Sequence, residues 1–122
     1  MTSEELKQRT KAYGLRVIPA VQALPRNDVA RTLGQQLLRA GTSVGANYRA
    51  ACRGKSRPDF INKLKIAEEE CDESLYWMEL LVDSALIPAR RLLLLQQEGS
   101  EILAILVASL RTTRAAVLNC KS

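Results

Sequence analysis

The sequence predicts an all-α fold, an antiparallel up-down-up-down bundle of four helices. Three proline-containing segments, residues 23–28, 53–59 and 85–90, divide the chain into long stretches. Within these stretches apolar residues recur at steps of three and four, as expected of helices with one buried face. With 122 residues and only 4% aromatic residues, the chain should form a single domain, residues 1–122, with an aliphatic core.

The first two predicted helices cover residues 3–23 and 28–52. Pro19 lies inside the first helix. Because proline lacks an N–H and its ring clashes with the preceding turn, we expect Pro19 to kink this helix or to end it early. Gly41 and Gly45 lie in the second helix, where each costs roughly 1 kcal/mol of helix propensity relative to alanine. We therefore expect a neighbouring backbone to approach closely at these glycines.

The third predicted helix begins with Ser56, a good N-cap, and has Pro58 in its first turn and Asp59 at the capping-box position. The fourth covers residues 88–119 and is apolar around most of its circumference, so we expect it to be buried on more than one side. A second apolar group lies opposite the core-facing residues of the third helix, and we expect this group or the apolar flank of the fourth helix to form a subunit interface. This group comprises Ile66, Trp77, Leu80 and Leu81.

The net charge of +5 conceals two strongly charged segments. Residues 25–57 carry seven cations and one anion, whereas residues 58–87 carry two cations and eight anions. At about 100° per residue, four arginines of the second helix fall within an arc of about 80°, opposite its apolar face. These four are Arg31, Arg39, Arg49 and Arg53. Four acidic residues of the third helix, Glu68, Asp72, Glu79 and Asp83, fall within about 60°.

Three interpretations of the arginine stripe remain open. It binds the phosphate groups of a nucleic acid, it is a solvated face, or it pairs with the acidic stripe of the third helix within or between subunits. In the first case Lys55 and Arg57, which follow the second helix, extend the nucleic-acid-binding surface. The acidic residues 68–73 are more typical of a solvated face than of a metal site, so we expect no metal and no cofactor.

The sequence favours a binding protein over an enzyme, and we assign no catalytic residue. It contains no histidine, the commonest general base and zinc ligand. A G-x-S-x-G pattern at residues 41–45 lies in a predicted helix, whereas the nucleophile elbow with that pattern follows a strand. Three cysteines without a CxxC pair, Cys52, Cys71 and Cys120, are expected to be free thiols in a reducing compartment.

The polarity of the first ten residues and the length of the apolar runs indicate a cytoplasmic protein. The segment 1–10 is polar and charged, unlike a signal peptide. The longest apolar run, residues 102–110, is far shorter than the roughly 20 residues that span a bilayer. We therefore expect a soluble protein without a membrane partner.

Two motifs within residues 37–88 carry a family resemblance. One is the group of small residues in the second helix, and the other is an S-x-x-[DE]-F start of the third helix, followed by an Ile-Ala pair and a Ser-Leu pair. The residues concerned are Ser43, Ala46, Asn47, Ser56, Asp59, Phe60, Ile66, Ala67, Ser74 and Leu75. With these motifs the chain resembles the four-helix-bundle family of 23S rRNA intervening-sequence proteins. It departs from the family pattern at residues 49–53, where many members have an acidic residue and a glycine.

The resemblance implies a homo-oligomer, expected to be a pentamer, and an origin in rRNA insertions of some bacteria. It also implies a relation to the accessory variability determinant of diversity-generating retroelements, a similar pentameric bundle that binds nucleic acid and works with a reverse transcriptase. We therefore expect a non-enzymatic protein that contacts RNA or DNA phosphates without reading sequence. The alternative is a protein-interaction adaptor, such as an accessory subunit of a retroelement reverse transcriptase.

Overall fold

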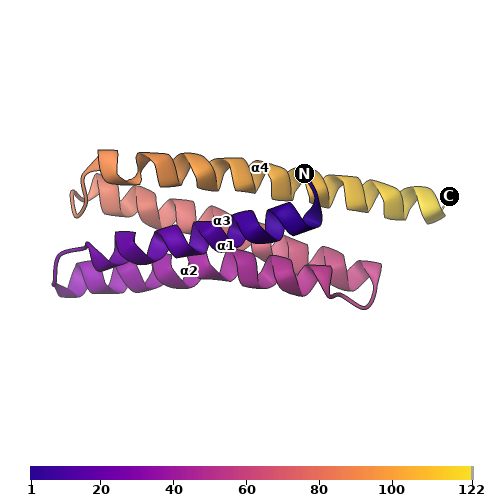
Figure 1. Ribbon diagram of the computed structural model, residues 1–122, viewed down its shortest axis with the longest axis horizontal. Coiled ribbons are helices and arrows are strands. Elements are labelled where there is room, and N and C mark those ends of the chain that lie inside the picture. Colours follow the sequence, from indigo (N-terminus) through magenta and orange to yellow (C-terminus); the bar gives the residue numbers. More distant parts are fainter. Residues whose placement is uncertain (122) are drawn as a thin grey trace.

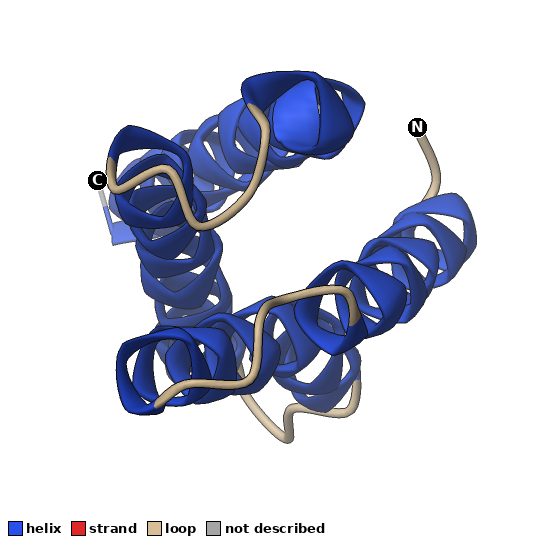
Figure 2. Cartoon of the chain, turned by 90° about the vertical axis from the view of Figure 1, so that its left-hand side faces the viewer, coloured by secondary structure: helices blue, strands red, loops and turns tan. Residues whose placement is uncertain are grey.

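The computed structural model describes the backbone of residues 1–121 and the side chains of residues 1–116. Four helices run alternately up and down and are joined by short turns, as the sequence predicted (Figure 1; Figure 2). They are α1 (Ser3–Gln22), α2 (Asp28–Cys52), α3 (Arg57–Asp83) and α4 (Ala89–Lys121). Each helix packs against its neighbours in the sequence, and α4 also contacts α1, though less extensively than it contacts α3.

Polar side chains fix where α2 and α3 begin. Asn27 Oδ1 accepts the Ala30 N–H at 2.8 Å, before the first turn of α2. Ser56 Oγ accepts the Asp59 N–H at 3.2 Å, which confirms Ser56 as the N-cap of α3. Asp59 does not complete a capping box, because its carboxylate accepts the N–H of Lys55 at 3.3 Å, one residue before the N-cap.

Pro19 lies in the last turn of α1 without ending the helix. The helix continues to Gln22, so the expectation that Pro19 ends it early is wrong. The hydrogen bond that proline cannot donate would go to the carbonyl of Leu15, a residue that is 58% exposed, so the loss falls on the solvent side of α1. The Pro19 carbonyl itself accepts the Ala23 N–H at 3.0 Å, which closes the helix.

The turn between α3 and α4 closes with a Schellman motif built on an alanine. Leu86 N–H donates to the Leu81 carbonyl and Ala85 N–H donates to the Val82 carbonyl, each at 3.0 Å. Ala85 has a φ of 61°, the left-handed conformation that glycine usually supplies at this position. The connection to α4 is therefore well hydrogen-bonded but strained at one residue.

The core is mainly aliphatic, as predicted, but it includes the phenol of Tyr13. Tyr13 on α1 is fully buried, and its Oη lies 2.7 Å from Ser74 Oγ on α3. Because the Ser74 hydroxyl donates to the Cys71 carbonyl at 2.6 Å, Tyr13 is the donor in this pair. Gly99 on α4 leaves the space for the phenol, since a Cβ there would lie 2.7 Å from Tyr13 Oη. These contacts join three helices at one level of the bundle.

The helices α1 and α2 pack tightly at the two glycines of α2, and the predicted approach of a neighbouring backbone is found at Gly45, whereas Gly41 meets a side chain. A Cβ on Gly41 would lie 2.7 Å from Val17 Cγ2. A Cβ on Gly45 would lie 3.2 Å from the backbone carbonyl carbon of Thr10. The low helix propensity of glycine is therefore offset by close packing, against the Val17 side chain at Gly41 and against the backbone of α1 at Gly45.

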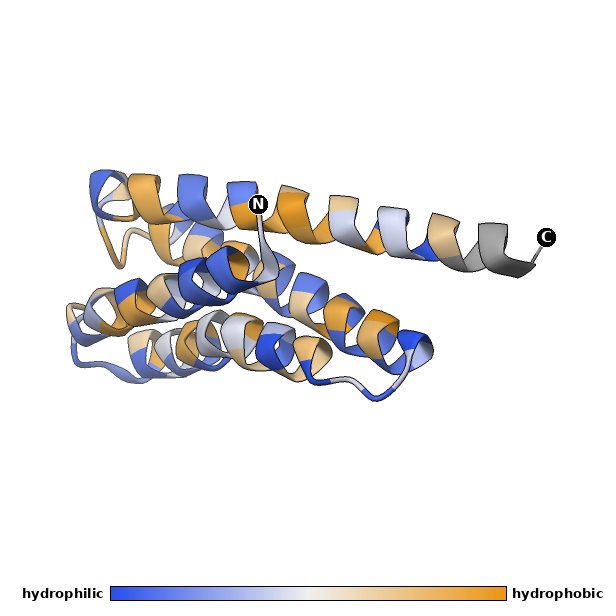
Figure 3. Cartoon of the chain, turned by 45° about the vertical axis from the view of Figure 1, so that its right-hand side comes forward, coloured by the Kyte–Doolittle hydropathy of each residue, from blue (hydrophilic) through white to orange (hydrophobic). Residues whose placement is uncertain are grey.

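The helix α4 buries one face within the single chain, so the expected burial on more than one side is not found there. Leu93 is 52% exposed and Leu94 is 67% exposed. Hydrophobic residues recur along the described length of α4 (Figure 3). By length and composition alone, Ala89–Ala116 could cross a membrane, a property that core helices of soluble bundles share. The sequence analysis considered only the longest uninterrupted apolar run, residues 102–110. It therefore overlooked the longer stretch Ala89–Ala116, in which polar residues are scattered among the apolar ones.

Candidate nucleic-acid interface

Arg39, in the middle of the predicted arginine stripe, is held by two carboxylates of α3. Its Nη1 lies 2.9 Å from Glu70 Oε2, and its Nη2 lies 2.5 Å from Glu73 Oε1. The hydrogen bond to Glu73 and the charge of Glu70 raise the pKa of Arg39 above its ordinary value. Trp77 Nε1 donates to the same Glu73 oxygen at 3.1 Å. Arg39 therefore joins α2 to α3, and its guanidinium is committed to that contact rather than available to a phosphate.

The ion pairs of Arg39 are of the kind described by the third interpretation of the arginine stripe, in which arginines of the second helix pair with carboxylates of the third helix. Here both partners of Arg39 belong to the same chain. Its partners, however, are not members of the predicted acidic stripe, of which Asp72, Glu79 and Asp83 are exposed and Glu68 is half-buried. Arg31 pairs with Asp28 one turn earlier on α2, with Nη1 2.9 Å from Oδ1. Both of these side chains are largely exposed, and ion pairs of this kind contribute little to stability.

Arg49 and Arg53 differ from Arg39, because within the described part of the chain neither one pairs with a carboxylate. Both are exposed and lie one helical turn apart at the C-terminal end of α2. Lys55 and Arg57 follow in the α2–α3 turn and at the first residue of α3, and both are exposed. Four of the six residues predicted to bind nucleic acid therefore lie at the end of α2 and in the turn that follows it.

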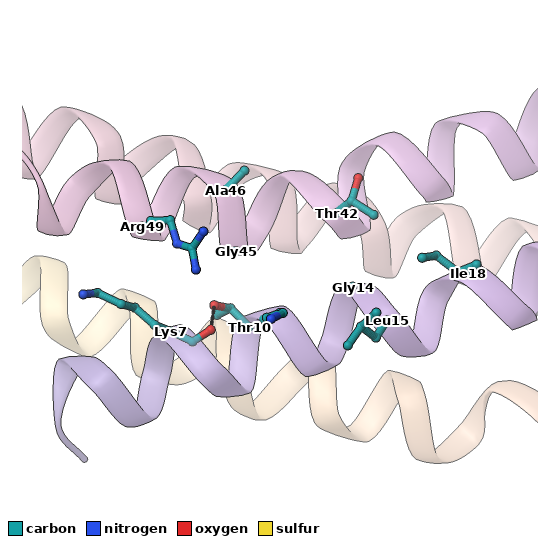
Figure 4. A pocket seen from close by; sticks show the side chains of 10 residues that line it. Lys7, Thr10, Gly14, Leu15, Ile18, Thr42, Gly45, Ala46 and Arg49 are labelled. Carbon is teal, nitrogen blue, oxygen red and sulfur yellow. Dashed lines mark hydrogen bonds between the residues drawn. The ribbon is translucent and has the colours of Figure 1, made fainter.

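Two lysines of α1 join these cations, and the sequence analysis missed them. Lys7 and Lys11 line a hollow of about 280 Å³ between α1 and α2, together with Arg49. Lys7 and Arg49 lie at the same end of this hollow and reach it from opposite helices (Figure 4). Glu4 pairs with Lys7 at 3.6 Å and offsets part of its charge. The spacing of four residues placed the lysines on one face of α1, but only the packing of α1 against α2 places that face beside Arg49.

The antiparallel topology gathers cations where α1 and α3 begin and α2 ends, and α4 passes the same end of the bundle (Figure 1). We call this group the basic end. It comprises Lys7, Lys11, Arg49, Arg53, Lys55, Arg57, Arg111 and Arg114. Glu4, Glu5 and Asp59 lie among these cations along the chain, and Arg9, between Lys7 and Lys11, pairs with Glu98 and Glu101 of α4. The excess of cations makes this end of the molecule positive, a property that attracts polyanions.

The four residues predicted as a subunit interface do not form one exposed face. Leu81 is 1% exposed and belongs to the core, so it has almost no surface left for another subunit, and its assignment to the interface is wrong. Trp77 is half-buried and packs on the core, while Ile66 and Leu80 are half-buried. The reason is that α3 packs against both α2 and α4, so a single chain already needs two apolar faces on this helix.

The structure places the sequence features that bear on catalysis and metal binding. The G-x-S-x-G pattern at residues 41–45 lies inside α2, where no strand precedes it. In the part of the chain with described side chains, no group of three or more His, Cys, Asp or Glu residues is placed to hold a metal ion. Cys71 is buried, and burial raises the pKa of its thiol to about 12; Cys52 is a half-buried free thiol. Cys120 lies outside the described side chains.

Comparison with known proteins assigns the family. The family model described as 23S rRNA-intervening sequence protein matches residues 3–108, which span α1, α2, α3 and most of α4. The chain belongs to this family. This family member is also similar to the crystal structure of a protein with unknown function from the S23 ribosomal protein family of Bacteroides thetaiotaomicron VPI-5482. The TM-score is 0.84 and the identity is 32%, over 91% of this chain and 99% of that chain. Among curated proteins, none matches this chain at a significant level. The resemblance drawn from residues 37–88 is therefore confirmed.

Proposed function

We propose that this family member is a non-enzymatic protein whose basic end binds the phosphate groups of RNA or DNA. The observation that carries the proposal is the convergence of Lys7, Lys11 and Arg49 on one hollow, with Arg53 one turn further along α2. These cations come from two helices and face solvent. Within the described residues, Arg49 and Arg53 have no carboxylate partner, so their charge is available to a ligand.

The chemistry of the basic end suits binding that does not depend on nucleotide sequence. Lysine and arginine side chains that neutralise phosphates release condensed counterions, which supplies most of the free energy of non-specific binding. Reading a base requires hydrogen-bonding groups aimed at base edges, and contacts to phosphates alone position a nucleic acid without selecting its sequence. We therefore propose a backbone-binding protein without cofactor, acting in the cytoplasm, where the thiols of Cys52 and Cys71 stay reduced.

We further propose that the protein acts as a homo-oligomer, with the pentamer that the family resemblance implies. The exposed Leu93 and Leu94 on α4 support self-association, because adjacent large apolar side chains on a surface favour contact with another protein surface. Several copies of the basic end in one assembly would strengthen phosphate contacts that are individually weak.

A second candidate function is an adaptor for another protein, such as a retroelement reverse transcriptase. This candidate places a protein partner, rather than a second copy of the chain, on Leu93 and Leu94, which lie at the start of α4, at the opposite end of the bundle from the basic end. A protein partner docked on these leucines would leave the basic end open. The two functions therefore use different surfaces and can be separated by mutation.

The experiment compares two double charge reversals. Arg49→Glu with Arg53→Glu alters the basic end, whereas Arg31→Glu with Arg90→Glu makes the same change in net charge at the opposite end of the bundle. We expect the first pair to weaken binding of a labelled RNA strongly and the second to weaken it only slightly. Sedimentation velocity checks that both variants keep the wild-type oligomer. Equal loss of affinity in both variants would show only a general charge effect, and an unchanged affinity in the first would exclude the phosphate role.

A further inference from the structure

The hollow between α1 and α2 has two chemically different parts. At one end Lys7, Lys11 and Arg49 supply positive charge. Toward the other end the lining is mainly apolar, with Leu15 58% exposed and Ile18 38% exposed, and Thr42 adds one hydroxyl, which donates to the Leu38 carbonyl (Figure 4). Cations and exposed aliphatic side chains thus share one concave site, and a ligand that fills it needs both an anionic and an apolar part.

Small residues leave the space that forms this hollow. Gly14 on α1 and Gly45 and Ala46 on α2 line it, and they carry no side chain beyond Cβ. Ala46 is exposed, so the space above it is open to solvent rather than filled by a neighbouring helix. A longer side chain at Ala46, on the exposed rim, would change the lining of the hollow without altering any charge.

We propose that this hollow binds one unpaired nucleotide of a single-stranded nucleic acid, with its phosphate among Lys7, Lys11 and Arg49 and its base and sugar over Leu15 and Ile18. The proposal rests on the nucleic-acid-binding function of the basic end and adds that single strands are preferred to duplexes. In a duplex the faces of the bases are stacked inside, and only the backbone and the base edges in the grooves are accessible, so no base face could cover the apolar part of the hollow. In a single strand each base has a free face that can cover apolar side chains.

A polymer suits this site better than a small anionic amphiphile. The positive surface does not stop at the hollow, because Arg53 lies one turn beyond Arg49 and Lys55 follows it. One helical turn advances about 5.4 Å along the axis. A ligand with a repeating negative charge can therefore contact Arg49 and Arg53 in succession, whereas a single carboxylate head group would use only the cations of the hollow.

The test measures binding of a short labelled oligouridylate and of a short RNA duplex to the full-length protein. Ala46→Leu adds a bulky side chain at the rim of the hollow and uses a good helix former at an exposed helical position, so the variant is expected to fold. Leu15→Gln makes the apolar part polar, and Val29→Gln is its matched control, since Val29 is 60% exposed on α2 and does not line the hollow. Thermal unfolding confirms that each variant is folded.

We expect Ala46→Leu and Leu15→Gln each to weaken oligouridylate binding about ten-fold, equivalent to about 1.4 kcal/mol. Duplex binding and the Val29→Gln control should stay near wild type. If both variants bind oligouridylate as the wild type does, or lose single-strand and duplex affinity by the same factor, the proposal is overturned while the phosphate-binding function stands. If the wild-type protein binds neither nucleic acid, both this proposal and the proposed function fail.

Discussion

Arg9 on α1 and Glu98 on α4 form a two-pronged ion pair, with Nη2 2.7 Å from Oε1 and Nε 2.8 Å from Oε2. The pair lies where α4 contacts α1, the less extensive of the two contacts that α4 makes. The Glu98 side chain is only 18% exposed, so a missing partner would leave a poorly solvated carboxylate. This pair is therefore the main polar link that closes the bundle between its first and last helices.

We predict that Arg9→Met lowers the free energy of unfolding at pH 7 by about 1–3 kcal/mol. The hydrogen bond from Arg9 lowers the pKa of Glu98 in the folded protein. The contribution of the pair is therefore complete above the ordinary glutamate pKa of about 4.3 and is lost as the pH falls through the lowered pKa. Urea unfolding at several pH values checks this: the difference between wild type and variant should shrink in acid. A difference that is constant down to pH 3 would contradict it.

We predict that Gly99→Ala destabilises the protein by about 1–3 kcal/mol, although alanine is the better helix former. The new Cβ would lie 2.7 Å from Tyr13 Oη and 2.8 Å from Leu75 Cδ2. The double variant Gly99→Ala with Tyr13→Phe should recover part of the loss, because the phenolic oxygen is removed from the closest contact. Thermal unfolding of the single and double variants provides the test, and a stabilised Gly99→Ala single variant would show that the helices can separate without cost.

We predict that Ala85→Gly stabilises the protein by about 1 kcal/mol, because an L-residue in the left-handed conformation costs roughly 1–2 kcal/mol and glycine avoids this strain. The hydrogen bonds of the Schellman motif involve backbone atoms and should persist. The melting temperature of Ala85→Gly should rise, and that of Ala85→Val should fall. An unchanged melting temperature in both variants would mean that the turn relaxes to a different conformation.

We predict that Arg39→Met lowers stability by up to about 1 kcal/mol and leaves nucleic-acid affinity close to wild type. The Arg39 side chain is 47% exposed, which limits what its ion pairs contribute. Its carboxylate partners Glu70 and Glu73 occupy the guanidinium, so removing it should not remove a phosphate contact. Melting and RNA-binding measurements on the same preparation separate the two effects. A large loss of RNA affinity with unchanged stability would show that Arg39 does contact the nucleic acid, contrary to this prediction.

Local sequence signals predicted the helices well, because capping, proline and apolar periodicity act within a few residues. The bounds predicted for α2 are those observed, Asp28–Cys52. The candidate site was harder to predict. Arg39 and Arg49 lie on the same stripe, yet only Arg39 meets carboxylates, because Glu70 is brought to it by the packing of α3. The contribution of Lys7 likewise depends on which face of α1 lies beside α2, a relationship that no single helix encodes.

The expected subunit interface shows the same limit. Two apolar faces on α3 were interpreted as a sign of a second subunit, but α3 packs against both α2 and α4 within one chain, and three of the four predicted interface residues are half-buried. Leu81 is buried for this reason. Leu93 and Leu94 are better candidates for an intermolecular contact, and they became distinguishable from core residues only when the burial of α4 was known.

The salt dependence of RNA binding tests the central claim, phosphate binding by the basic end, most directly. The measurement is the slope of the logarithm of the binding constant against the logarithm of salt concentration, for wild type and for Arg49→Glu with Arg53→Glu. Each phosphate contact on a single strand contributes a slope of about −0.7, so loss of two contacts should make the slope less steep by about 1.4. The sedimentation coefficients of the two proteins should be the same. An identical slope in the two proteins would contradict the account.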